Sequence, residues 1–576
     1  MSPEQAQGQL ATLDARSDVW SLGAILFELL AGERARAAGN AYAAVFSAVT
    51  GEAPDPAVRA PGRRIPAAIA AVCRRALAPA PADRYPSAEA LARAVEQHLE
   101  GARRRAEADV QVARAFAAWT RFGELATEQA RLRERRDALG DGVAPWVPLQ
   151  DRPELVEVRR RLVGLAPEHT AAFSDTVAAC EAALVHDPEH TRAHALLADA
   201  CWSRFEEAEA HGDELAMAYF GRLVRQHDPA RYGPRLDGAG TVTLITDPAG
   251  AEVTCREFDR HGLVWALGPE RFLGVTPLLD VPLAMGSYAL TLKHGDTTVT
   301  YPVLIERNGA WRSGGTRRSG TPPVPLLEIP DAIYVPGGPA ITGGDPDAGQ
   351  PEPRRWRAVD GFAIARHPVT CGQWCEYLNA LAATDADAAY ARVPRLDAGD
   401  RSQAELWPRR DRYEPPIVDR DGDAWQADWP ISGIHWDDAC AYAAWRAQRD
   451  GVPWRLPTEA EWEKAARGVD GRHLPWGDEF HPSLCKMRRS RPGRAGPEPV
   501  GSFAADTSVY GVQDIAGGIR EWCGDASFDG RTTERPVKGG SWGSEPRTCR
   551  LATRLGLEPW YVVTTYGFRL ARDLPN

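Results

Sequence analysis

The stretch of sequence that decides the fold is Trp454-Arg455-Leu456-Pro457-Thr458-Glu459-Ala460-Glu461-Trp462-Glu463-Lys464-Ala465-Ala466-Arg467-Gly468. Thr458 followed by Glu461 has the spacing of a capping box, which predicts that a helix over 459–467 begins there. Trp462 and Ala466 would share the buried face of this helix, and Arg455 is placed to pair with an acidic group. The stretch therefore indicates a loop-rich domain held together by buried Trp, Arg and Glu side chains.

The composition changes around this stretch, because 13 of the 19 tryptophans fall after residue 350. Other short motifs surround it on both sides. In chain order they are Tyr334-Val335-Pro336-Gly337-Gly338, Arg366-His367-Pro368-Val369-Thr370, residues 429–439, Pro475-Trp476-Gly477-Asp478, residues 510–514, Glu521-Trp522, Lys538-Gly539-Gly540-Ser541-Trp542 and Gly567-Phe568-Arg569.

These motifs, in this order, resemble the formylglycine-generating enzyme family, also called sulfatase-modifying factors. The resemblance covers residues 329–573 and implies a C-type-lectin-like fold. The founding enzyme of the family oxidises a substrate cysteine to formylglycine with dioxygen, and two cysteines hold its Cu(I). The family pattern places these cysteines three and eight positions beyond the serine of Lys-Gly-Gly-Ser, which here gives Ser544 and Cys549. A hydroxyl is a hard, weak ligand for Cu(I), so the resemblance favours a member that is not an oxidase.

Two further site predictions come from the same domain. The calcium-site motif of the family reads Gly517-Gly518-Ile519-Arg520-Glu521-Trp522 here, with glycine in place of asparagine, which implies a weakened calcium site with Glu521 as its candidate ligand. Between the last two motifs lie Trp560, Tyr561 and Arg554, and aromatic and arginine side chains are the usual anchors of recognition surfaces. These three residues are the predicted ligand contacts.

The first 100 residues carry a different set of motifs. Met1-Ser2-Pro3-Glu4-Gln5 opens the chain, an apolar helix follows Ser17-Asp18-Val19-Trp20, and Ala82-Asp83-Arg84-Tyr85-Pro86 precedes an amphipathic helix. The three blocks resemble the end of the C-lobe of a bacterial Ser/Thr protein kinase, which implies a buried ion pair between Glu4 and Arg84. The phosphate-binding and catalytic motifs of kinases lie upstream of these blocks, so kinase activity is not expected from this chain alone. Two interpretations stay open: Met1 is an internal codon of a longer kinase, or the segment is a remnant that serves as a docking platform.

The middle of the chain predicts two more modules. Residues 101–235 indicate a helical connector that ends in tetratricopeptide-like helices at 172–183, 193–202 and 214–225. Residues 238–307 switch to a period of two and predict a small β-sandwich-like module that resembles the PEGA domain. Residues 308–328 are rich in Gly, Arg, Ser and Pro and predict a linker. The predicted fold class is therefore multidomain α+β.

Bulk composition restricts the partners of the chain. A net charge of -11 gives no basic field for nucleic acid, and no stretch approaches the roughly 18 apolar residues of a membrane span. The ten cysteines form no C-x-x-C motif, which favours reduced thiols and a cytoplasmic location.

Three hypotheses of function follow. The first is a cytoplasmic bacterial signalling or adaptor protein with a protein partner, whose C-terminal domain acts as a binding or sensor module. The second is a copper oxidase with an altered site, in which Cys549 is the catalytic metal ligand and Ser541 lies in the pocket. The third is a Ser/Thr kinase whose front half is missing from the sequence.

Overall fold

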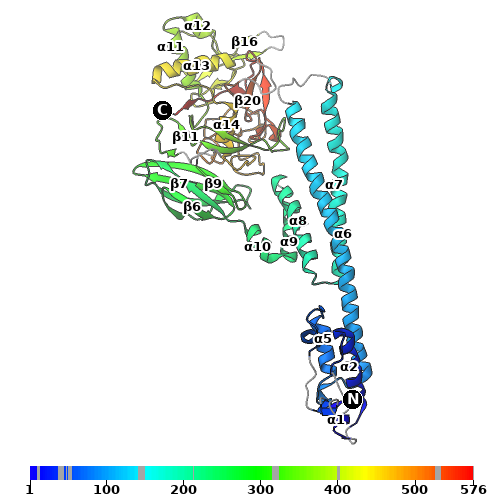
Figure 1. Ribbon diagram of the computed structural model, residues 1–576. Helices are drawn as coiled ribbons and strands as arrows, with labels where there is room; N and C mark the ends of the chain where they lie inside the picture. The colour runs from blue at the N-terminus through cyan, green and yellow to red at the C-terminus, as the bar shows by residue number, and fades with distance from the viewer. Residues whose placement is uncertain are drawn as a thin grey trace. The chain divides into compact units, whose positions relative to one another are not determined.

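The computed structural model describes residues 1–9, 13–36, 45–46, 48–49, 55–140, 149–211, 213–313, 323–397, 403–525 and 533–574. It divides into two compact units, of which the first runs to Tyr232 and the second begins at Gly233 (Figure 1). None of the described helices is both long enough and apolar enough to cross a membrane.

The first unit begins with four short to medium helices: α1 (Pro3–Ala6), α2 (Ala15–Ala31), α4 (Pro56–Arg59) and α5 (Ala67–Ala76). The Asp14 side chain caps the start of α2 by accepting from Arg16 N, and Gly32 ends the helix at φ 75°, a conformation that glycine adopts without steric penalty. A small core of Trp20, Phe27, Cys73 and Leu77 joins α2 to α5.

The acidic residue of the opening motif lies against a distant arginine. Arg84 Nη1 donates to Glu4 Oε1 at 2.8 Å and Arg84 Nη2 donates to Glu4 Oε2 at 3.0 Å, and both side chains are buried. Ser17 Oγ donates to the same carboxylate at 2.7 Å. Burial alone would raise the pKa of Glu4, but the hydrogen bonds from Arg84 and Ser17 lower it to about 2. The carboxylate is therefore charged at neutral pH.

Two long helices follow, α6 (Ala88–Gly140) and α7 (Pro153–His186). They run antiparallel, because Ala108 packs near Ala183 while Phe122 packs near Leu165. The sequence predicted the helical connector and three separate later helices. In the structure the first of those three, 172–183, is the end of α7, while the other two lie within α8 (Thr191–His211) and α9 (Glu214–His227). The division between the units falls within α10 (Pro229–Asp237).

The second unit opens with a two-sheet β module. One sheet has the order β6-β1-β9, and the other joins β4, β3, β7 and β8, with β5 also paired to β3. Alternating apolar side chains of both sheets, among them Val242 and Leu290, share one core. The strands are β1 (Gly240–Leu244), β2 (Thr246–Asp247), β3 (Glu252–Asp259), β4 (Ala266–Leu267), β5 (Arg271–Val275), β6 (Leu278–Leu283), β7 (Gly286–His294), β8 (Thr297–Ile305), β9 (Ala310–Arg312) and β10 (Val324–Pro325).

Residues 308–328, predicted as a linker, contribute two of these strands. β9 pairs with β1 in parallel, and β10 pairs with β2 in parallel. The abundance of Gly, Arg, Ser and Pro in the segment led to the linker prediction, but backbone pairing does not depend on side-chain composition alone. Within the described residues the β module therefore extends past residue 307; residues 314–322 lie outside them.

The β module contacts the C-terminal domain through charged and aromatic side chains. Ser287 Oγ donates to Asp470 Oδ2 at 2.5 Å, and the same carboxylate pairs with Arg472 at 2.6 Å. The Arg472 guanidinium also lies over the rings of Phe258 and Trp265, 4.2 and 4.8 Å from their centroids. Asp470 and Arg472 are almost fully buried as side chains, so the β module and the domain share a desolvated interface.

Within the described residues, the C-terminal domain consists of short strands around three longer helices: α11 (Cys371–Ala382), α13 (Trp436–Asp450) and α14 (Glu459–Arg467). Its first and last strands meet in the sheet β11-β14-β23, which joins β11 (Ile333–Val335), β14 (Phe362–Ile364) and β23 (Ala571–Asp573). A second sheet has the order β21-β20-β19-β22, made by Leu555–Leu557, Arg535–Lys538, Arg520–Trp522 and Tyr566–Gly567. The remaining elements are β12 (Gly338–Thr342), β13 (Arg355–Val359), α12 (Ala386–Tyr390), β15 (Arg395–Asp397), β16 (Gln403–Glu405), β17 (Ile417–Val418) and β18 (Ala424–Trp425).

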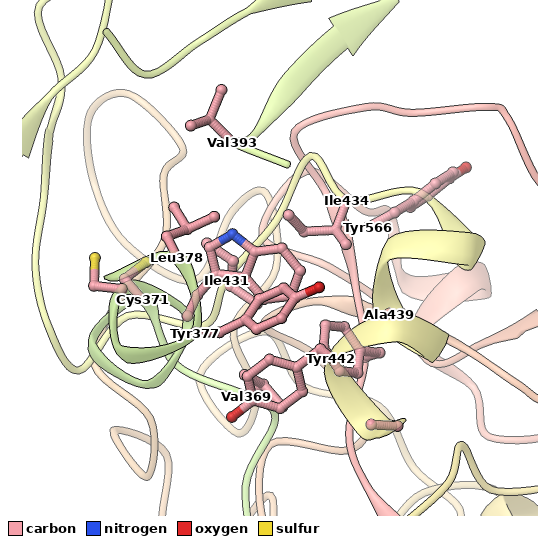
Figure 2. Packing of buried hydrophobic residues seen from close by; sticks show 14 of the residues in the cluster. Val369, Cys371, Tyr377, Leu378, Val393, Ile431, Ile434, Ala439, Tyr442 and Tyr566 are labelled. Carbon is pink, nitrogen blue, oxygen red and sulfur yellow. The ribbon is translucent and has the colours of Figure 1, made fainter. Parts of the chain in front are cut away.

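An aromatic core joins α11 to α13 (Figure 2). The rings of Tyr377 and Tyr442 meet edge to face, with centroids 5.5 Å apart, and Trp374 stacks on Tyr442 at 5.4 Å. Such pairs add to the stabilisation that apolar burial gives. The core explains the concentration of aromatic residues in this half of the sequence.

Candidate functional site

Helix α14 begins where the capping box predicts. Glu461 N donates to Thr458 Oγ1 at 3.2 Å, and Thr458 N donates to Glu461 Oε2 at 2.7 Å. Arg455 pairs with Glu461 at 2.7 Å, and Trp462 and Ala466 are fully buried. The local prediction for this helix is confirmed.

Glu521, the predicted calcium ligand, lies in a buried ion pair. Arg569 Nε donates to Glu521 Oε2 at 2.6 Å and Arg569 Nη2 donates to Glu521 Oε1 at 2.7 Å; both side chains have no exposed surface. Trp462 Nε1 donates to Oε2 at 2.8 Å. Both oxygens are therefore committed to protein donors, and Glu521 acts as a structural partner of Arg569. Among the described residues, no group of three or more His, Cys, Asp or Glu side chains is placed to hold a metal ion.

Ser544, at the first of the two predicted copper positions, bonds to Ser541, the residue predicted to lie in the pocket. Ser544 Oγ accepts from Ser541 N at 2.9 Å and lies 3.0 Å from Ser541 Oγ. Both side chains are buried, at 2% and 7% exposure for Ser541 and Ser544. The hydroxyl that replaces the family thiol therefore closes a local turn.

Cys549 is fully buried at the end of a short 3-10 helix, Pro546–Cys549. It lies so close to the Lys-Gly-Gly-Ser loop that a Cβ at Gly540 would be 2.7 Å from its Sγ and 2.5 Å from Ala516 O. Only glycine is accommodated at that position. Close packing therefore requires the second glycine of the Lys-Gly-Gly-Ser motif, independently of the family resemblance.

The structure places a second thiol beside Cys549 that the sequence argument missed. Cys485 belongs to the same buried cluster, and its hydrogen bond with Cys549, together with burial, raises the pKa of the Cys485 thiol well above its usual value. Neither side chain has exposed surface. No spacing rule links the two cysteines, because 64 positions separate them along the chain.

The side chains present do not fit a Cu(I) centre of the family type. Cu(I) prefers soft thiolates, and the first of the two positions holds the Ser544 hydroxyl. Cys485 supplies a second thiol, but it stands outside the family pattern, and both sulfurs lie in a buried apolar cluster. The residues present therefore do not support metal-dependent oxidation at this site.

The predicted ligand face is only partly formed. Trp560 is 36% exposed and lies 6.2 Å from Tyr561, ring centroid to centroid. Arg554, predicted on the same face, is instead buried at 5% exposure and pairs with Glu352 and Glu459. Arg554 therefore does not lie on the exposed face with Trp560, and its sequence position does not reveal the two distant carboxylates that pair with it.

A cavity of about 590 Å³ lies elsewhere in the domain. Its walls come from residues 328–333, residues 365–370, Gln373 of α11, Tyr442 and Arg446 of α13, Trp454, Val500 and Leu570. Cys549, Ser541 and Ser544 do not line it. Sequence reasoning gave no indication of this cavity, since its walls are far apart along the chain.

Comparisons with known proteins support one family. Residues 318–574 match the family described as the sulfatase-modifying factor enzyme 1-like domain. The chain is similar to the inactive C-alpha-formylglycine-generating enzyme 2 of Mus musculus, with 30% identity over 42% of this chain and 85% of that protein. It is also similar to the serine/threonine-protein kinase Pkn1 of Chlamydia trachomatis, with 29% identity over 44% of this chain and 39% of that protein.

Among solved structures, PvdO from Pseudomonas aeruginosa aligns with a TM-score of 0.34 and 24% identity, covering 42% of this chain and 94% of that chain. The mouse relative is covered over most of its length, and the matched family spans the whole C-terminal domain described above. Through residues 318–574, the chain belongs to the sulfatase-modifying factor, or formylglycine-generating enzyme, family.

Proposed function

We propose that this chain is a signalling or adaptor protein whose C-terminal domain recognises a ligand or protein partner and does not oxidise cysteine. The observation that carries the proposal is the buried Ser541–Ser544 hydroxyl pair at the position where the family resemblance requires a copper thiolate. The similar mouse protein, whose name describes it as inactive, also supports a function other than cysteine oxidation.

The signalling part of the proposal has separate support. The Glu4–Arg84 ion pair is the contact that the resemblance to a kinase C-lobe implies, and a protein named as a Ser/Thr kinase is similar to 44% of this chain. We interpret residues 1–100 as a kinase C-lobe segment, the helices α7 to α9 as tetratricopeptide-like and the β module as PEGA-like. All ten cysteines are free thiols, in keeping with a cytoplasmic location.

Trp560 and Tyr561 stay in the proposal as contacts for a protein partner. They are neighbouring aromatic side chains near the Gly567-Phe568-Arg569 motif, and Trp560 is partly exposed. Aromatic side chains of this kind supply much of the energy of protein recognition. Arg554 is excluded from this surface by its burial.

A turnover assay tests the non-oxidase part. We expect the full chain, incubated with copper, dioxygen and a cysteine-containing peptide, to give no aldehyde product by mass spectrometry, because no second thiolate stands at position 544. A Cys549→Ser variant should be indistinguishable from the wild type. An aldehyde product that disappears with Cys549→Ser would overturn the proposal and favour the altered copper oxidase, with the thiol pair Cys485–Cys549 as its metal site.

A further inference from the structure

The cavity of about 590 Å³ has the size of a small-molecule site, since such sites usually enclose roughly 300–1,000 Å³. It lies between the start of the domain and the helices α11 and α13. Backbone pairing holds two of its walls: Ala365 N donates to Leu570 O at 2.8 Å and Val369 N donates to Phe568 O at 3.0 Å. The cavity is thus formed by segments already fixed by the fold.

The floor of the cavity is apolar. The half-buried side chains of Ile329, Ile333 and Val500 form it together with Trp454, which is 8% exposed, whereas Tyr442, Val369 and Leu570 have almost no exposed surface. Figure 2 labels Val369 and Tyr442, which belong to the same buried cluster. Such a floor favours an apolar group on a ligand, because its burial removes apolar surface from water.

One side of the cavity offers positive charge and N–H donors. Arg366 donates through Nη1 to Gly511 O at 3.0 Å, and no carboxylate among the described residues lies within ion-pair distance of its guanidinium. Gln373 uses its Oε1 to accept from Thr370 N at 3.0 Å, which leaves the amide NH₂ group for another acceptor. Both residues lie near the N-terminus of the 12-residue helix α11, where the helix dipole is positive.

The other basic side chains of the cavity already lie against carboxylates. Arg446 pairs with Asp450 at 2.5 Å, and His367 lies 3.2 Å from Asp514. Arg366 is therefore the cavity cation that lacks a carboxylate partner within the part of the chain described.

Negative charge comes from the segment that precedes β11. Glu328 and Asp331 line the cavity and are exposed, and within the described ranges neither forms an ion pair. Asp331 adopts φ 60°, a left-handed conformation that aspartate and asparagine tolerate better than most residues. A ligand with a single negative charge would meet Arg366 but would also be repelled by these two carboxylates.

We propose that this cavity binds a small zwitterion of the amino-acid type with an apolar side chain. Its carboxylate lies at Arg366 and Gln373, its ammonium group at Glu328 and Asp331, and its side chain on Ile333 and Trp454. The inference deepens the proposed recognition function and rests on it. The cavity presents a positive charge at Arg366 and negative charges at Glu328 and Asp331 around one apolar floor. It should therefore bind a ligand with both a negative and a positive group more tightly than a simple anion or a simple cation.

The test uses the full chain labelled with 5-fluorotryptophan, and Trp454→Phe assigns the fluorine resonance of Trp454. The probes are L-phenylalanine, N-acetyl-L-phenylalanine, which keeps only the carboxylate, and L-phenylalaninamide, which keeps only the ammonium group. We expect a saturable shift of the Trp454 resonance with phenylalanine and at least roughly tenfold weaker binding of either single-charge probe, since one charge-assisted contact is lost in each. A dipeptide, L-phenylalanyl-glycine, tells whether the site takes free amino acids or short peptides.

Two variants separate the charges. Arg366→Gln should weaken the binding of phenylalanine and N-acetyl-phenylalanine about tenfold and leave that of phenylalaninamide unchanged. Asp331→Asn should weaken the binding of phenylalanine and phenylalaninamide about tenfold and leave that of N-acetyl-phenylalanine unchanged. Arg357→Gln, which changes an exposed arginine of β13, is the matched control and should change nothing. The proposal is overturned if no probe shifts the Trp454 resonance, or if all three bind equally. Such failure would leave the cysteine-peptide assay, and with it the non-oxidase proposal, unaffected.

Discussion

Replacing Arg569 by methionine is expected to lower the free energy of unfolding of the C-terminal domain by about 3–5 kcal/mol, the usual effect of removing one partner of a buried ion pair. Arg569 and Glu521 have no exposed surface, so the remaining carboxylate would stay in the interior without a counter-charge. Arg569 also donates to the carbonyl oxygens of Ala365, Arg366, Gln513 and Asp514, and these would lose a donor as well.

Urea denaturation followed by tryptophan fluorescence measures this effect, because 13 of the 19 tryptophans lie after residue 350. The control Arg357→Met removes an exposed arginine and should change stability by less than about 0.5 kcal/mol. The double variant Arg569→Met with Glu521→Gln should be less destabilised than Arg569→Met alone. The uncompensated charge is then gone, and an amide oxygen at position 521 still accepts from Trp462 Nε1. A loss below about 1 kcal/mol for Arg569→Met would contradict the structural role given to this pair.

The second large effect is expected at the other end of the chain. Arg84→Met should destabilise the helices α1, α2 and α5 by about 3–5 kcal/mol, because Glu4 would stay buried beside Ser17 without its counter-charge. Arg84 also donates to the backbone oxygens of Ala78, Pro79 and Arg16, which tie the loop before α6 to the start of the chain. Hydrogen exchange of α2 measures the loss, and Arg93→Met, which removes an exposed arginine, is the control.

The Glu4–Arg84 ion pair also makes the stability of the first helices depend on pH. The folded-state pKa of Glu4 is about 2, below the usual value near 4.5, so the unfolded chain binds the proton first as pH falls. The stabilisation from Glu4 is therefore complete above about pH 4.5 and is lost as pH falls from there toward 2. In Glu4→Gln this part of the pH dependence of α2 exchange should be absent. An unchanged pH profile would show that the pair does not hold the segment.

The sequence predicted those parts of the fold that follow from local rules. Thr458 and Glu461 are three residues apart, and a capping box depends only on that spacing, so the start of α14 was accessible from the sequence. The alternation in 238–307 likewise indicated a β module. The linker prediction at 308–328 was wrong for β9 and β10, because strand pairing was set by the partner strands β1 and β2.

The candidate site was harder to predict from the sequence, because its contacts join residues that are far apart along the chain. Ser544 and Cys549 follow from a motif, but Cys485 reaches Cys549 only through the folded chain. Arg554 has the sequence context of an exposed anchor, but Glu352 and Glu459 lie against it in the folded domain. The cavity cation Arg366 lies within a recognised motif, yet nothing local distinguishes it from a structural arginine.

The measurement that tests the central claim most directly is an anaerobic Cu(I) titration of the full chain, in competition with a colorimetric Cu(I) chelator. We expect no tight binding by the wild type and one equivalent bound by Ser544→Cys, which restores two thiols at the family spacing; adding Cys549→Ser should abolish that gain. Tight one-to-one binding by the wild type that disappears with Cys549→Ser or Cys485→Ser would contradict the account and show that the buried thiol pair is a metal site.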